Sequence, residues 1–326
     1  MSQQFGVTAK AIRQSKHLTL QNVADEQLSV SALSRFENGQ ADLTVTKFAH
    51  LLERLWTTPE EFVFRYLQDK NTFDLNGYLS MGNMLMRFFP QGKQFTGDAG
   101  HSTAEQIRAK FNQALPALDA QIASSHDPIK RFARPLWELL REEMVDTGNN
   151  DFHFPQPHPE YTTGIRQYLM ALDDWGEFDI YMFTGFMPGF APKVEKQLFQ
   201  LAMTRAVKYQ DFRSTRELIF RVLENQFNLC MAWCDYAAAK ECLTEYENQL
   251  KSSTNANNNI NYLFNRGWYR LRTDKVTAGT EDCEHALTVT KFLKLTDEDH
   301  DLSELYHFIQ THNGKDDWRR AAIFID

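Results

Sequence analysis

The residues that indicate chemistry most clearly form a short run near the N-terminus, SALSRFENG. Leu33 and Phe36 fall on one side of a helix drawn through this run, and Gly39 follows it. Glycine ends a helix at little cost because it has no Cβ atom to oppose a left-handed backbone. The polar members share the opposite face at the spacing i, i+3, i+4, i+7: Ser31, Ser34, Arg35 and Asn38. A short helix with such a face can enter the major groove of DNA.

Each exposed group on this helix predicts a particular contact. Arg35 can bind guanine through two hydrogen bonds, worth about 1–3 kcal/mol of discrimination, or hold a phosphate without specifying a sequence. Ser31 and Ser34 are short enough to let the helix approach closely. Val30 and Ala32 can meet thymine methyl groups or pack against the preceding helix. Phosphate contacts are expected of Lys10, Lys16 and Lys47, each of which can instead be a solvated charge.

Five short helices are predicted over residues 1–68 to position this run. The first covers about 7–16, the second begins after Thr19, and the third, capped by Ser29, contains the run. The fourth covers 45–56, and the fifth begins at Pro59 after a threonine cap at 57 or 58. A brief turn at 26–28 separates the second and third helices. That spacing is typical of a helix-turn-helix.

The rest of the chain predicts a second, helical domain. Residues 69–102 are rich in glycine and are expected to form a linker and an irregular first element. From residue 103 to 326 the periodicity is helical, with loops expected at 153–159, 186–192 and 252–259. Cys242 and Cys283 mark a weak repeat at a spacing typical of helical hairpins, about 34–47 residues. We expect an all-α fold with stacked, TPR-like hairpins; a generic all-α domain is the alternative.

Composition limits the classes of function. The chain has 326 residues, 42% hydrophobic residues and a net charge of −8, enough for two cores. Residues 1–68 hold seven basic and seven acidic side chains, so the negative charge belongs to the remainder and only the first part suits DNA. No apolar run spans a membrane and no secretory signal is evident. Four sparse cysteines indicate reduced thiols, so we expect a cytoplasmic protein.

Catalytic and metal-binding patterns are absent from the sequence. His300, His307 and His312 do not have the i, i+4 spacing of a metalloprotease helix. Cys230 and Cys234 have no second cysteine pair nearby, so buried thiols are favoured over zinc ligands. No phosphate-binding glycine loop or nucleophile elbow is found. We therefore expect no enzyme, no metal and no cofactor; an enzyme with a vestigial N-terminal domain is the remote alternative.

The N-terminal segment resembles the Cro-like, xenobiotic-response-element class of helix-turn-helix, through Leu18-Thr19, Val23-Ala24, Leu28-Ser29 and residues 33–39. More narrowly, SRFENG, ADLT and TPEEF resemble the Rgg/GadR/MutR regulators. A second similar stretch, LDDWGEFDIYMF, spans residues 172–183. We expect its Trp175, Phe178 and Phe183 to lie in a core.

The resemblance implies a cytosolic homodimer that binds DNA and, in many members, a short re-imported peptide on the concave face of the repeats. It implies a buried ion pair between Arg13 and Glu37, whose alternative is two solvated charges, and places Ser31, Ser34 and Arg35 toward the groove. Leu20 departs from the glutamine common in relatives, so Gln21 is expected to supply that phosphate contact. Val30 likewise replaces a polar residue of several relatives.

Amide and guanidinium side chains suit a peptide ligand because they pair with its backbone groups. Two helical faces of the second domain present such groups, although a solvent-facing stripe explains them equally well. They are Arg221, Asn225 and Asn228 on one face, and Asn261, Asn265 and the adjacent Arg266 on another.

Together these observations predict a sequence-specific, dimeric transcriptional regulator. Its N-terminal domain binds double-stranded operator DNA, and a short peptide bound to the helical repeats controls it. The alternative is a DNA-binding regulator whose repeats form a protein-interaction scaffold without a small ligand.

Overall fold

The computed structural model describes residues 2–68, 104–148, 156–206, 213–251, 253–312 and 314. All regular secondary structure in these ranges is helical, which confirms the all-α class. The chain divides into two compact units, Met1–Met84 and Leu85–Asp326. The expected linker at 69–102 lies outside the described residues. Among the helices that are described, none is long and apolar enough to cross a membrane.

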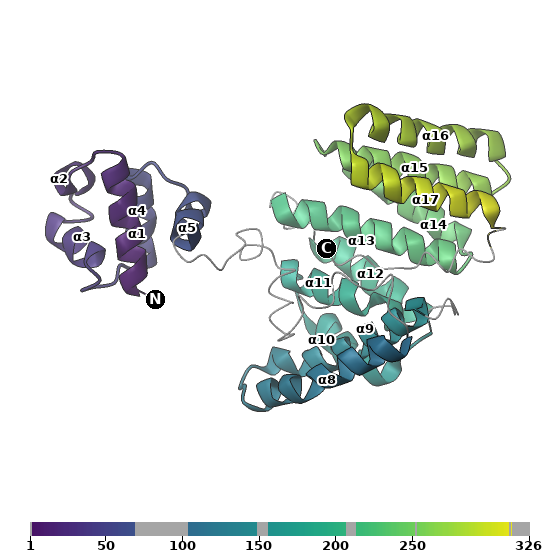
Figure 1. Ribbon diagram of the computed structural model, residues 1–326, viewed down its shortest axis with the longest axis horizontal. Helices are drawn as coiled ribbons and strands as arrows, with labels where there is room; N and C mark the ends of the chain where they lie inside the picture. The colour runs from purple at the N-terminus through teal and green to yellow at the C-terminus, as the bar shows by residue number, and fades with distance from the viewer. Residues whose placement is uncertain are drawn as a thin grey trace. The chain divides into compact units, whose positions relative to one another are not determined.

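The first unit contains the five predicted helices (Figure 1). The cap predictions hold: Thr19 Oγ1 accepts the Asn22 N–H at 3.2 Å, and Ser29 Oγ accepts that of Ala32 at 3.3 Å. Gly39 has φ 68°, the left-handed value expected of it. The first helix begins earlier than predicted. The helices are α1 (Ser2–Ser15), α2 (Leu20–Val23), α3 (Val30–Glu37), α4 (Val45–Arg54) and α5 (Pro59–Gln68).

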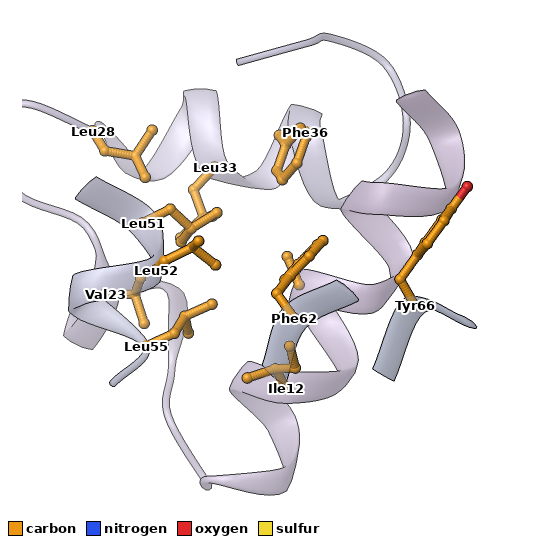
Figure 2. Packing of buried hydrophobic residues seen from close by; sticks show 11 residues of the cluster. Ile12, Val23, Leu28, Leu33, Phe36, Leu51, Leu52, Leu55, Phe62 and Tyr66 are labelled. Carbon is orange, nitrogen blue, oxygen red and sulfur yellow. The ribbon is translucent and has the colours of Figure 1, made fainter. Parts of the chain in front are cut away.

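One apolar core holds the five helices together, and Figure 2 shows its side chains converging. Phe62 of α5 packs edge-to-face on Phe48 of α4 and Phe5 of α1, with ring centroids 4.9 and 5.6 Å apart. Such pairs add to the stabilisation from area burial. The labelled core residues are Ile12, Val23, Leu28, Leu33, Phe36, Leu51, Leu52, Leu55, Phe62 and Tyr66.

The second unit is a stack of helices (Figure 1). Three neighbouring pairs form hairpins, and the turns of the last two are alike: Cys234 and Asp274 both adopt positive φ, 53° and 60°. The hairpins are α8 (Ala104–Ala123) with α9 (Ala133–Gly148), α13 (Arg213–Ala232) with α14 (Tyr236–Leu250), and α15 (Ala256–Arg272) with α16 (Val276–Leu293). Between and after them lie α10 (Pro159–Ala171), α11 (Glu177–Phe186), α12 (Pro192–Ala206) and α17 (Thr296–Thr311), with short 3-10 turns at Pro128–Phe132 and Met187–Gly189.

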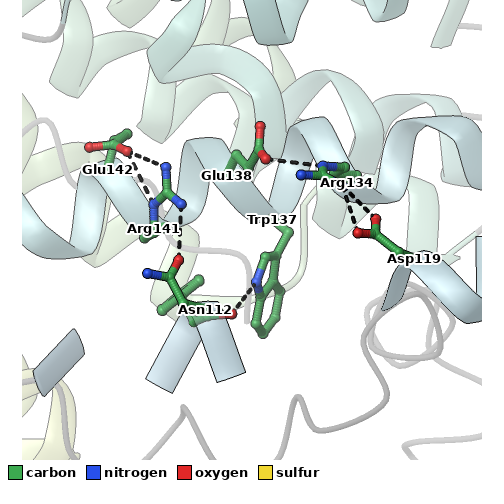
Figure 3. Close-up of polar contacts among 8 residues, drawn as sticks. Asn112, Asp119, Arg134, Trp137, Glu138, Arg141 and Glu142 are labelled. Atoms are coloured by element: carbon green, nitrogen blue, oxygen red, sulfur yellow. Dashed lines mark hydrogen bonds and ion pairs between the residues drawn. The ribbon is translucent and has the colours of Figure 1, made fainter. Parts of the chain in front are cut away.

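Polar contacts join α8 to α9, as Figure 3 shows. The Trp137 indole N–H donates to the Phe111 carbonyl at 3.1 Å inside the contact. At the surface Arg134 donates to both oxygens of Asp119, at 2.7 and 2.6 Å. The buried bond satisfies a polar group that burial would otherwise penalise.

Close backbone approach joins α15 to α16. A Cβ atom on Gly267 would lie 2.5 Å from Cys283 Sγ and 2.9 Å from the Gly279 carbonyl oxygen. No real Cβ contact is that short, so the packing requires glycine at this position.

The polar loop expected at 252–259 is shorter than predicted, because α15 begins at Ala256. Asn255 caps the helix by accepting the Asn257 N–H at 3.0 Å. Asn258 is buried and donates to Glu217 of α13 at 3.3 Å. Contacts made across the fold therefore stabilise a helix start whose composition favours a loop.

Trp175 and Phe183 of the tryptophan segment (residues 172–183) lie in the core, as predicted, whereas Phe178 is half-buried. Trp175 is fully buried, donates to the Leu169 carbonyl at 3.0 Å and packs on Phe183. Asp179 accepts the Gly176 N–H at 2.9 Å and the Tyr168 hydroxyl at 2.8 Å. Burial and this second bond raise the pKa of Tyr168 to about 12. These contacts hold the N-terminal end of α11 against α10.

Candidate DNA interface and ligand site

The polar face of α3 lies at the surface of the first unit. Ser31, Arg35 and Asn38 are exposed and Ser34 is half-buried, whereas Leu33 and Phe36 are buried. Val30 is exposed, so its side chain is available to a ligand. Ala32 packs against the core, which is the second of its two predicted roles.

A buried ion pair anchors the C-terminal end of α3 to α1. Arg13 Nε and Nη2 donate to Glu37 Oε1 and Oε2, both at 2.7 Å, and Arg13 Nη1 donates to the Leu18 carbonyl at 2.7 Å. The hydrogen bond to Glu37 is the main cause of the raised pKa of Arg13. A bidentate pair fixes orientation as well as distance, so α3 is held at a defined angle on α1.

The other residues predicted to contact DNA differ in what they can offer. Gln21 and Lys47 are exposed and Lys10 is half-buried. Lys16 is different: its ammonium donates to the carbonyls of Leu55 at 2.6 Å and Trp56 at 2.8 Å. The ammonium group thus pairs with carbonyl groups at the C-terminal end of α4, where the helix dipole favours a positive charge. Because its ammonium group is already bound, we no longer propose Lys16 as a phosphate contact.

In the second unit the predicted peptide contacts separate into two groups. Asn225 and Asn265 are 1% and 8% exposed, so both lie inside the packed helices. Arg266 donates through two nitrogens to Asp282 of α16, both at 2.8 Å, and this pair braces α15 against α16. Helical spacing placed Asn225 and Asn265 on polar faces, but packing against neighbouring helices buries these two side chains. Arg221, Asn228 and Asn261 remain half-buried.

A polar network that joins α13, α14 and α15 includes Asn261, and sequence reasoning missed most of it. Glu224 accepts from Asn261 at 2.8 Å and from the Tyr246 hydroxyl at 2.7 Å. Burial raises the pKa of Glu224, and these two hydrogen bonds oppose the shift. A signal existed, because four polar residues of α13 repeat at i, i+4, i+7, i+11: Glu217, Arg221, Glu224 and Asn228.

Arg221 is the incompletely paired member of this network. Its Nη1 is buried and has no hydrogen-bond partner among the described residues. Burial raises the pKa of both Tyr181 and Glu224, and the positive charge of Arg221 opposes that rise. A buried N–H without a partner costs free energy, and a ligand oxygen can remove that cost.

A family model described as "HTH-type transcriptional regulator Rgg, C-terminal domain" matches residues 138–304, just over half of the chain. The chain belongs to the Rgg family of transcriptional regulators. The matched stretch runs from α9 to α17 of this Rgg-family chain, and it includes the tryptophan segment and both turns of the repeated hairpins.

Solved structures share the whole fold. The chain is 19% identical to the SHP pheromone receptor Rgg2 of Streptococcus dysgalactiae, with 93% and 98% of the two chains covered and a TM-score of 0.66. A Listeria monocytogenes EGD-e protein described as a transcriptional regulator is 17% identical, with 95% and 98% covered and a TM-score of 0.71. The PrgX/cCF10 complex is 13% identical, with 96% and 95% covered and a TM-score of 0.62. At these identities the likeness establishes the fold.

Proposed function

We propose that this Rgg-family protein is a cytoplasmic, homodimeric regulator that binds operator DNA through α3 and a short peptide through its helical unit. The DNA contacts are Val30, Ser31, Ser34 and Arg35, with Gln21, Lys10 and Lys47 on the phosphates. The observation that supports this most is the exposed face of α3, held by the buried pair of Arg13 and Glu37. One such domain makes few contacts, so two copies are needed for useful affinity.

The test of DNA binding starts from a duplex selected by the wild-type protein from a randomised pool. Affinity for this duplex and for a scrambled duplex is measured at several salt concentrations, for wild type, Arg35→Ala and the control Glu26→Ala in the exposed turn. Loss of a base contact costs about 1–3 kcal/mol, five- to over a hundredfold, on the selected duplex alone. An equal loss on both duplexes with a smaller salt slope indicates a phosphate contact. If the pool yields no preferred sequence, the proposed DNA function is wrong.

The peptide proposal is supported by the relatives and by the network on α13. Rgg2 is described as a pheromone receptor, and PrgX was solved in complex with cCF10. A further similar structure is described as a bacterial peptide pheromone/receptor complex. In this chain Arg221, Asn228 and Asn261 offer donors to peptide carbonyl or carboxylate oxygens. Binding at α13 and α15 favours one arrangement of the helical unit, and that preference is the coupling to DNA binding.

A library of short synthetic peptides, screened by thermal shift, tests this part. A binding peptide is then titrated against Arg221→Ala and against Asn248→Ala, an exposed control on α14. Loss of a charged hydrogen bond costs about 1.5–3 kcal/mol, so the first variant binds at least tenfold more weakly and the control is unchanged. If no peptide shifts the melting temperature, the helical unit is better described as a protein-interaction scaffold. Sedimentation measures the dimer.

A further inference from the structure

Helix α4 directs two polar side chains, one turn apart, at the turn between α2 and α3. His50 Nε2 lies 2.7 Å from Asp25 Oδ2 in that turn. Arg54 donates from Nη2 to the Asn22 carbonyl at 2.8 Å and from Nε to the Val23 carbonyl at 3.1 Å. Asn22 and Val23 end α2, where carbonyl groups lack helical partners and a cation is favourable. Arg54 therefore fastens the end of α2 to α4.

Asp25 organises the turn itself. Its Oδ1 accepts the N–H groups of Gln27 at 2.9 Å and Leu28 at 3.1 Å, and its own N–H donates to the Leu28 carbonyl at 3.0 Å. This is a side-chain turn of the kind that aspartate forms with the backbone that follows it. Since Oδ1 holds the turn, Oδ2 faces α4, where His50 meets it. The hydrogen bond from His50 is the main cause of the lowered pKa of Asp25.

The apolar core does not fix this turn. Val23 and Leu28 are fully buried at its two ends, but Asp25, Glu26 and Gln27 between them are exposed. Two further polar contacts lie beside the bonds that His50 and Arg54 make with the turn. Arg54 Nε lies 3.7 Å from Asp25 Oδ2, and Glu53 Oε2 lies 3.8 Å from His50 Nδ1. Asp25 holds the turn together internally, and the described polar contacts that tie it to another helix come from α4.

We propose that His50 and Arg54 are positioning residues for DNA recognition: by clamping the turn to α4 they set the angle at which α3 meets the groove. This inference rests on the proposed function of α3. It concerns specificity more than affinity, because base contacts need exact placement whereas phosphate contacts tolerate small shifts. Neither side chain is assigned a contact with DNA.

The experiment uses the full chain and the two duplexes defined above, the selected one and its scrambled form. The variants are His50→Ala, His50→Gln, Arg54→Ala and the control Glu60→Ala at an exposed position of α5, each checked for its helical signal by circular dichroism. We expect His50→Ala and Arg54→Ala to lower the ratio of selected to scrambled affinity about tenfold. The slope of affinity against salt stays constant, because it counts phosphate contacts.

Rescue separates positioning from general damage. Glutamine keeps an amide N–H near the place of His50 Nε2, so His50→Gln restores most of the ratio of selected to scrambled affinity. The control Glu60→Ala leaves this ratio unchanged. The inference is overturned if folded His50→Ala and Arg54→Ala keep the wild-type ratio. A reduced salt slope would equally overturn it, since that outcome makes the residue a phosphate contact. If wild type itself prefers no sequence, the proposed DNA function fails first, and that result precedes any comparison of variants.

Discussion

A buried carboxyl group in the helical unit gives the sharpest prediction about stability. Glu195 of α12 is fully buried, and its Oε2 accepts from Gln226 Nε2 of α13 at 2.9 Å. Glu195 Oε1 and Gln226 Oε1 are both buried without a hydrogen-bond partner among the described residues. Burial raises the pKa of Glu195 from 4.5 to about 7, although the bond from Gln226 and the charge of Lys196 oppose the shift.

The size of the effect follows from this pKa. The pKa difference between 4.5 and about 7 corresponds to about 3.5 kcal/mol, at about 1.4 kcal/mol for each pH unit. The folded protein holds the proton more tightly than the unfolded chain. The free energy of unfolding therefore falls as the pH rises from about 4.5 to about 7, and the cost is complete above that window.

Glu195→Gln replaces the carboxylate with a neutral amide of the same shape. We expect it to raise the free energy of unfolding by about 3 kcal/mol at pH 8 and by less than about 1 kcal/mol at pH 5. Urea denaturation of the full chain at both pH values measures this, with an unchanged slope against urea. Glu241→Gln is the control, because Glu241 is exposed and 3.7 Å from Lys196. An equal effect of Glu195→Gln at the two pH values would refute a buried, titrating carboxyl.

Two further predictions concern packing. Glu37→Ala leaves the Arg13 guanidinium buried without its counter-ion, so it should cost about 3–5 kcal/mol; calorimetry of the full chain tests this, and a loss below about 1 kcal/mol would contradict a buried pair. Gly267→Ala forces a methyl group against Cys283, so urea denaturation should show a loss of at least about 1–3 kcal/mol. Gly164→Ala is its matched control in the middle of α10, where the nearest atom to the new Cβ lies 3.7 Å away, and it should gain about 0.5–1 kcal/mol. If the two glycine variants behave alike, close helix approach is not the reason for Gly267.

Local signals were sufficient where a few neighbouring residues determine the structure. The caps at Thr19 and Ser29 act within three residues, and Gly39 needs only its own backbone to reverse direction. The alternation of buried and exposed positions in α3 follows from helical geometry alone. For the same reason the class of fold and the position of the exposed polar face of α3 were predictable from the sequence.

Contacts between distant residues could not be predicted in this way. Lys16 meets the end of α4, 39 residues further along the chain, and the turn clamp joins Asp25 to His50. Spacing showed that Asn225 shares a face with Arg221, but it could not show that packing buries the asparagine. Composition predicted a loop at Asn255. It could not reveal that this side chain caps α15 and donates to Glu217 of α13.

The sequence by itself determined the all-helical class, the caps of α2 and α3 and the family, because caps and side-chain periodicity depend on contacts within about one or two turns. The tertiary structure decided which polar groups remain available. Lys16 and Arg266 bind groups of neighbouring helices, so their charges stabilise helix packing. Burial raises the pKa of Glu195, whereas Arg35 remains exposed at the surface. The physical reason is that burial and pairing depend on which helices meet, and that is settled only when the core forms.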